Sequence, residues 1–69
     1  MQIKYFPDTD TLYVSFTENE IVETKDLSED VLIDLDTQGQ LVGMTIEHAQ
    51  QRADIANFSY QQVVAQQAA

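Results

Sequence analysis

Apolar and polar residues alternate along the N-terminal part of the chain. Residues 2–6, QIKYF, and residues 11–16, TLYVSF, place apolar side chains at every second position. A period of two is typical of a half-buried strand, which aromatic and β-branched residues favour. Between them, residues 7–10, PDTD, combine a proline with two aspartates, and both residue types are common in turns. This region therefore predicts a β-hairpin.

A third, more polar segment follows this hairpin. Residues 21–25, IVETK, include Glu23 and Lys25 and come after the polar residues 17–20. Charged side chains within a short strand are typical of the edge of a sheet. We therefore expect an edge strand at 21–25, followed by a polar connection over residues 26–30.

The segments VLIDLD (31–36) and LVGMTI (41–46) form the clearest pair of strands. With Gln38-Gly39 as a two-residue corner, the apolar residues of both segments fall on one face, which is how register is usually selected. The expected pairs are Val31 with Ile46, Ile33 with Met44 and Leu35 with Val42. An alternative corner is a type I turn over residues 36–39 with a glycine bulge.

The spacing changes after residue 46. Alanines recur at three- and four-residue intervals over residues 49–56, among glutamine and arginine, which favour helices. This spacing predicts a helix over 47–57. Ser59 with a glutamine three residues later resembles a capping box and predicts a second short helix over 60–67.

Together these elements predict one small α+β domain. It would be a four- or five-stranded antiparallel β-meander with a C-terminal helix packed on one face. Residues 1–52 would form the sheet and the start of the helix, and residues 53–69 a C-terminal helical extension. The chain has 69 residues and no cysteine, so its core is small and no disulfide supports it. Association with a second copy would add buried surface, and we therefore expect a homodimer.

Charge narrows the choice of partner. Twelve acidic residues face three basic ones, giving a formal net charge of −9. Such a surface repels nucleic acid and anionic membranes and attracts basic proteins. The N-terminus lacks the apolar run of a signal peptide, so we expect a cytoplasmic protein. The residues expected to contact a basic partner are Glu18, Glu20, Glu23, Asp26, Glu29 and Asp30.

Two ordered motifs carry a resemblance to a known family. The first is IKYFPDTDTLYVSF, which ends in a D-x-L-Y-[IV]-x-F strand, and the second is VLIDLDTQGQLVGMTI over residues 31–46. The matching residues are Tyr5, Asp10, Leu12, Tyr13, Val14 and Phe16 in the first motif, and Asp34, Asp36, Gly39, Val42, Gly43 and Ile46 in the second. With these motifs the chain resembles the bacterial family called domain of unknown function 2283.

The resemblance covers residues 1 to about 52 and leaves the glutamine-rich tail outside it. Phe6 is a mild departure, because an acidic residue is commoner near that position. The resemblance implies a small antiparallel sheet with a C-terminal helix and implies no activity. Some members look like antitoxins encoded beside toxin genes, which suggests a protein partner without indicating the residues that would bind it.

The spacing D-x-D-x-Q-G at residues 34–39 also opens a calcium-binding loop. Asp34 and Asp36 are therefore candidate ligands for a divalent cation or small ligand, which is the alternative function. However, a calcium loop needs a bidentate glutamate at its twelfth position, where this chain has Thr45, and helices on both sides. We expect the two carboxylates to lie on a solvated face beside a turn, with no cofactor bound.

Catalysis finds little support in the residues. The single histidine, His48, falls between the predicted sheet and helix, and the serines lie in no nucleophile-elbow context. We expect His48 to be a surface or capping residue and the protein not to be an enzyme. The pattern favours a small acidic interaction module, which associates by charge and is held by apolar surface. The resemblance implies an antitoxin-like role as the specific form of this function.

Overall fold

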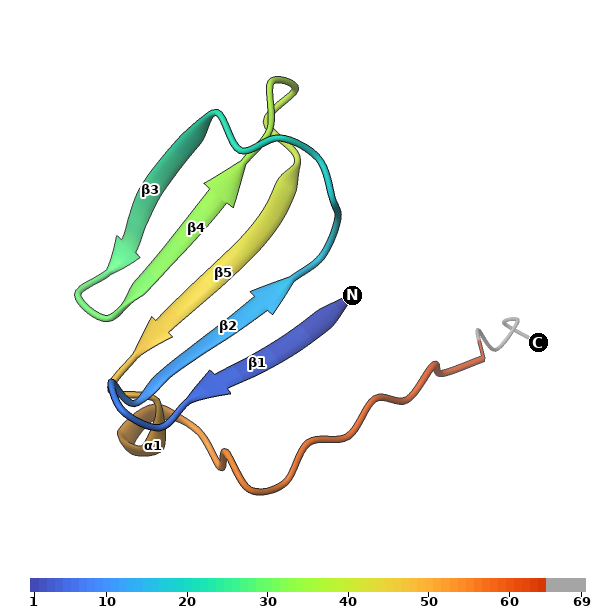
Figure 1. Cartoon of the computed structure of the whole chain (residues 1–69). Helices are drawn as coiled ribbons and strands as arrows, with labels where there is room; N and C mark the ends of the chain where they lie inside the picture. The colour runs from blue at the N-terminus through green and yellow to red at the C-terminus, as the bar shows by residue number, and fades with distance from the viewer. Residues whose placement is uncertain (65–69) are drawn as a thin grey trace.

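The computed structural model describes residues 1–64 and contains one five-stranded antiparallel sheet with a one-turn helix (Figure 1). Its elements are β1 (Gln2–Phe6), β2 (Thr11–Ser15), β3 (Glu23–Ser28), β4 (Val31–Leu35), β5 (Leu41–Glu47) and α1 (Ala49–Arg52). The prediction of an antiparallel sheet of four or five strands followed by a C-terminal helix is confirmed, with five strands and a helix of one turn.

The strands lie in the order β1-β2-β5-β4-β3, so the meander is interrupted once. β3, β4 and β5 follow one another as hairpins, but β2 pairs with β5 rather than with β3. Composition explains this order, because β5 is largely apolar and suits a central position. The sequence of β3, ETKDLS, is polar and fully exposed, and suits an edge. The edge position predicted for this strand is therefore correct, but the strand spans Glu23–Ser28 rather than residues 21–25, so residues 26–28 are strand and not the predicted connection.

The β4–β5 hairpin resolves the two alternatives for its corner. Val31 pairs with Ile46 and Ile33 with Met44 as predicted, but Leu35 pairs with Leu41, so Val42 is left as a bulge. The predicted two-residue corner is therefore wrong. The Gly39 N–H donates to the Asp36 carbonyl at 3.0 Å, and Gly39 has a φ of 77°, as a type I turn followed by a glycine bulge requires.

Alternation divides the side chains of the strands between two faces of the sheet. The apolar face is defined by Ile3, Tyr5, Leu12, Val14, Val31, Ile33, Leu35, Val42, Met44 and Ile46. The opposite, polar face is defined by Gln2, Lys4, Tyr13, Ser15, Thr24, Asp26, Leu32, Asp34, Gly43 and Thr45. Both faces belong to a single layer, because the described chain contains no second sheet and only one turn of helix.

The helix predicted over 47–57 is wrong in length. α1 is confined to Ala49–Arg52, begins after His48 in a left-handed conformation with a φ of 53°, and ends at Ala53 in an extended one. So short a helix depends on tertiary packing, and only Ala49 is buried. Asp54 and Asn57 then bond to each other, which competes with helix formation.

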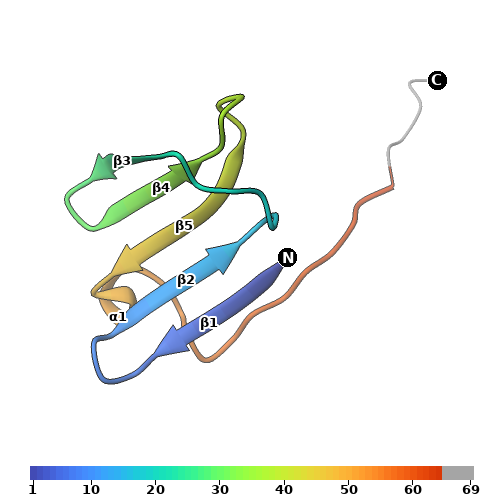
Figure 2. The same ribbon diagram turned by 45° about the horizontal axis from the view of Figure 1, so that its top comes forward.

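The C-terminal segment does not form the second short helix that was predicted to begin at residue 60. Residues 60–64 have no regular structure, and residues 65–67 of the predicted second helix lie outside the described residues. The segment leaves the end of the sheet at α1 and extends past the β1 edge (Figures 1 and 2). Within residues 1–64, no helix is long and apolar enough to cross a membrane.

Candidate interaction surfaces

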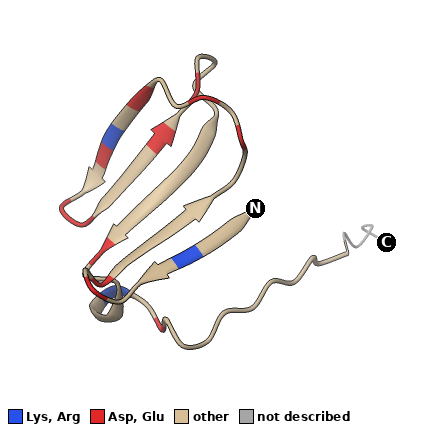
Figure 3. Cartoon of the chain, in the orientation of Figure 1, with Lys and Arg blue, Asp and Glu red and all other residues tan. Residues whose placement is uncertain are grey.

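The acidic side chains gather along β3 and the connections on either side of it (Figure 3). We define the acidic edge by five of the six predicted partner-binding residues, all exposed: Glu18, Glu20, Glu23, Asp26 and Glu29. Glu23 pairs with Leu35 of the apolar face and Asp26 with Leu32 of the polar face. Negative charge is therefore presented on both sides of this edge.

Asp30, the sixth predicted residue, is used within the chain. Its Oδ2 accepts hydrogen bonds from Arg52 Nη2 at 2.7 Å and Nε at 3.0 Å, and its Oδ1 lies 3.1 Å from His48 Nδ1. The Asp30 side chain is only 14% exposed. These contacts, the Arg52 hydrogen bonds first and His48 second, hold the pKa of Asp30 below its ordinary value. Asp30 therefore ties α1 to the β3–β4 turn.

Asp10 ties the other end of α1 to the β1–β2 turn. The Tyr5 hydroxyl donates to Asp10 Oδ1 at 2.6 Å, and the N–H of Gln50 donates to the same oxygen at 3.1 Å. The Ala49 N–H donates to the Asp10 carbonyl at 2.9 Å. Mainly through its hydrogen bond to Asp10, the Tyr5 hydroxyl has a raised pKa. This role was not predicted, because its partner lies 40 positions away in the sequence.

Asp36 shapes the corner of the β4–β5 hairpin. Its Oδ1 accepts the N–H groups of Gln38 and Gln40, each at 2.9 Å, and its Oδ2 accepts Asn19 Nδ2 at 3.0 Å. The Gln40 N–H is the main cause of a lowered pKa at Asp36. Asn19 lies in the β2–β3 connection, so one carboxylate fixes both the turn and the connection that passes it.

Asp34 lies on the polar face but is only 9% exposed, so the prediction that both carboxylates lie on a solvated face is wrong for Asp34. Its Oδ1 accepts a hydrogen bond from Thr24 Oγ1 at 2.7 Å, and its Oδ2 accepts one from the Tyr13 hydroxyl at 3.3 Å. Burial first, and then the Asp34 carboxylate, raise the pKa of Tyr13. Gly43 leaves the space in which the Tyr13 ring lies, because a Cβ at that position would collide with its hydroxyl.

The two candidate cation ligands, Asp34 and Asp36, therefore have separate structural roles. Asp34 joins β2, β3 and β4 across the polar face, while Asp36 closes a turn. Among residues 1–64, no three His, Cys, Asp or Glu side chains are grouped so that they could hold a metal ion. A cation at either aspartate would have to displace hydrogen-bond donors of the chain itself.

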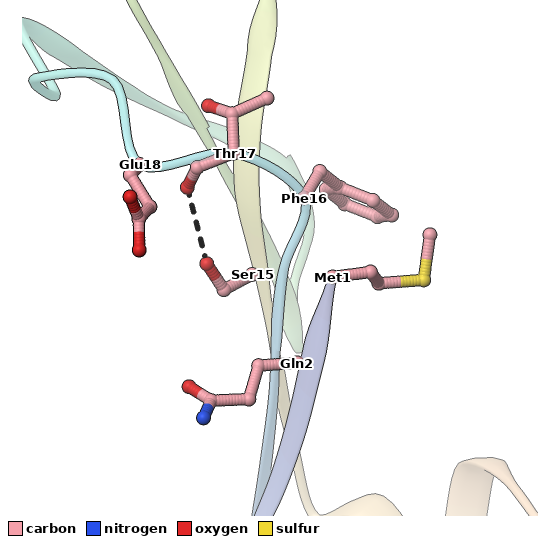
Figure 4. Close-up of a pocket in the computed structure, with 6 residues that line it drawn as sticks. All are labelled: Met1, Gln2, Ser15, Phe16, Thr17 and Glu18. Atoms are coloured by element: carbon pink, nitrogen blue, oxygen red, sulfur yellow. Dashed lines mark hydrogen bonds between the residues drawn. The ribbon is translucent and has the colours of Figure 1, made fainter.

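A shallow polar pocket lies where β1 begins and β2 ends (Figure 4). Met1 and Phe16 lie together on one side of it, and Gln2, Ser15 and Glu18 lie on the other. The Ser15 hydroxyl donates to the Thr17 carbonyl at 3.2 Å, and no basic side chain lines the pocket to activate it. The pocket offers hydrogen-bonding groups but no arrangement for nucleophilic catalysis.

The C-terminal segment lies against the apolar face at its β1–β2 side. There a groove lies between the sheet and the C-terminal segment, with Ile3, Leu12 and Val14 on one side and Ile55 and Phe58 on the other. Phe58 and Tyr60 also line a second hollow, together with Met1 and Ile3. The apolar side chains of the segment are strongly exposed: Phe58 66%, Tyr60 71%, Val63 79% and Val64 82%.

Comparison with known proteins gives one finding. The family model described as protein of unknown function (DUF2283) matches residues 2–50. The match covers all five strands and the start of α1 and leaves out the C-terminal segment. No curated protein and no solved structure matches the chain.

Proposed function

We propose that this chain, which belongs to the family of proteins of unknown function DUF2283, is a non-enzymatic interaction module that binds a basic protein. The observation that supports this proposal most directly is the acidic edge, where five exposed carboxylates follow one another along β3 and its connections. An antitoxin-like role, in which a cytoplasmic basic partner is neutralised, is the concrete version.

Electrostatics gives the edge two tasks. Clustered charges of one sign raise the rate of encounter with oppositely charged proteins, and they repel phosphate backbones and anionic lipids. Surface charges are screened beyond about 8 Å at physiological salt, so the effect depends on ionic strength. Apolar contact must then hold the complex, and the exposed Ile21, Val22 and Leu27 lie among the acids of this edge and are available for it.

β3 also offers backbone groups to a partner. It is an edge strand with β4 as its single neighbour, so one side of its backbone is unpaired in the sheet. Its charged side chains disfavour pairing with a second acidic β3. A basic partner strand would instead meet opposite charges along the same edge.

The test is affinity capture of the tagged full chain from a lysate of its source, washed at low and at high salt. The edge variant Glu20→Gln/Glu23→Gln/Asp26→Asn removes three charges from the acidic edge. The matched control Asp8→Asn/Glu47→Gln/Asp54→Asn removes three exposed charges elsewhere and gives the same net charge.

We expect a basic protein to be retained at low salt by the wild type and the control and to be lost from the edge variant. With the purified partner, the edge variant should associate about tenfold more slowly at low salt, which is the lower end of the range for electrostatic steering. Equal retention by both variants, or no enrichment of any basic protein, would contradict the proposal.

A further inference from the structure

The apolar face stands out because the chain buries so little elsewhere. Among residues 1–64, only Val42 and Ala49 are fully buried hydrophobic residues, and no large side chain is enclosed completely. The other residues of the apolar face remain half-buried. A domain with so small a core needs additional burial to be stable.

Charge separates this face from the rest of the surface. Although the chain carries a net charge of −9, the strand residues on the apolar face include one acid, Glu23, and one base, Lys25. Asp54 adds one further acid where the C-terminal segment lines the groove beside Ile3 and Leu12. The face is therefore apolar and carries much less charge than the acidic edge, so a basic protein has little electrostatic reason to select it and a second copy meets it with little repulsion.

Area gives a further constraint. Five strands spaced about 4.8 Å apart, each of about five residues, give the face a flat footprint of about 400 Å². Two such footprints sum to about 800 Å², whereas a specific interface buries about 1,200–2,000 Å² of accessible surface. Sheet-to-sheet contact benefits from more apolar surface than the strands alone provide.

Residues 58–64 offer that surface. Their four apolar side chains are 66–82% exposed, and no residue after Asp54 is charged. Seven extended residues span about 23 Å, which matches the width of a five-stranded sheet. In its own copy this segment begins beside Met1 and Ile3, with Phe58 and Tyr60, and then extends past the β1 edge instead of crossing the sheet (Figures 1 and 2).

We infer that a second copy of this chain covers the apolar face, with residues 58–64 of each copy lying across the sheet of the other. The interface is self-complementary, as a two-fold dimer requires, and exchange of a terminal segment is a low-cost route to such a dimer. The acidic edges remain at the periphery, so this dimer forms with or without a basic partner.

The test is sedimentation equilibrium of the purified full chain over a wide concentration range. The variant Val63→Asp/Val64→Asp adds two charges to the apolar positions of the segment. The matched control Gln61→Asp/Gln62→Asp adds the same two charges at neighbouring exposed positions. Both changes lie outside the sheet, so the circular dichroism of the strands should be unchanged.

We expect a dimer whose Kd rises at least about tenfold in the valine variant, because burial of each valine side chain is lost twice per dimer. The change in log Kd for the control variant should be less than half of the change in log Kd for the valine variant. A monomer at every concentration would overturn the inference. A dimer equally affected by both variants, or by neither, would overturn the exchange of segments.

Discussion

Replacing Gly43 with alanine tests how the polar face is built. Substituting alanine for a glycine with ordinary backbone angles usually stabilises a protein by about 0.4–1 kcal/mol, because the unfolded chain loses conformational freedom. Gly43 does not have a positive φ. Considered without its neighbours, the substitution Gly43→Ala should therefore be favourable.

The residues around Gly43 make the substitution unfavourable instead. A Cβ at Gly43 would lie 2.9 Å from Tyr13 Cζ, closer still to the Tyr13 hydroxyl, and 3.2 Å from the Val14 carbonyl. The tyrosine ring has to move away, which removes its hydrogen bond to Asp34. Overpacking costs about 1–3 kcal/mol, and the small gain from the unfolded chain offsets part of it. We expect Gly43→Ala to lower the free energy of unfolding by about 1–2 kcal/mol.

A double-mutant cycle isolates the cause. In a Tyr13→Ala background the same Gly43→Ala change meets only the Val14 carbonyl, and should be neutral or slightly stabilising. The coupling energy between positions 13 and 43 should be about 2 kcal/mol. Urea unfolding followed by circular dichroism measures it, at one protein concentration because self-association alters apparent stability. Stabilisation of the wild type by Gly43→Ala would refute the reasoning.

Four further outcomes are expected. Gly39→Ala should lower the free energy of unfolding, measured in urea, by about 1–2 kcal/mol, because Gly39 has a φ of 77°. Gly39→Asn should lower it less, and an equal loss for both variants would show that the positive φ is not the cause. Because the pKa of Asp36 is lowered in the folded state, its ionised carboxylate stabilises the fold above the ordinary carboxyl pKa, and this stability is lost as pH falls through the pKa of the folded state. The Asp36→Asn variant should therefore lose less stability than the wild type when both are titrated with acid. An unchanged dependence of stability on pH would count against the turn contacts of Asp36. Arg52→Gln should raise the pKa of Asp30 toward its ordinary value, as measured by NMR titration of the carboxyl group. An unchanged pKa would show that Arg52 and Asp30 do not form an ion pair in solution. Calcium should leave the melting temperature unchanged, and a rise that Asp34→Asn abolishes would favour the cation-binding alternative.

The strands could be predicted from alternation because their pattern is local. Val31 and Ile33 pair with Ile46 and Met44 as the apolar pattern requires. Periodicity favours the two-residue corner, which is wrong, because it does not reveal that Asp36 accepts two backbone N–H groups and stabilises the alternative type I turn. Strand order also lay beyond periodicity, since it depends on which strands tolerate an exposed edge.

The helix and the candidate site depend on contacts between distant residues, which local sequence patterns do not reveal. Alanine spacing favours a helix after residue 47, but α1 has only one turn and is held by Asp10 and Asp30 from distant turns. In the sequence, Asp30 cannot be distinguished from the exposed acids around it. Only the structure shows that it forms an ion pair with Arg52. Exposure of Glu18, by contrast, follows from its polar surroundings.

The measurement that tests the central claim most directly is the solvent accessibility of two neighbouring methyl groups on β5. Met44 lies on the apolar face and Thr45 on the polar face, and both are half-buried within one copy. NMR relaxation by a soluble paramagnetic agent can be recorded for both methyl groups over a range of protein concentrations. The account predicts that Met44 becomes protected as concentration rises while Thr45 does not. Equal relaxation of Met44 at all concentrations would contradict an interface on the apolar face.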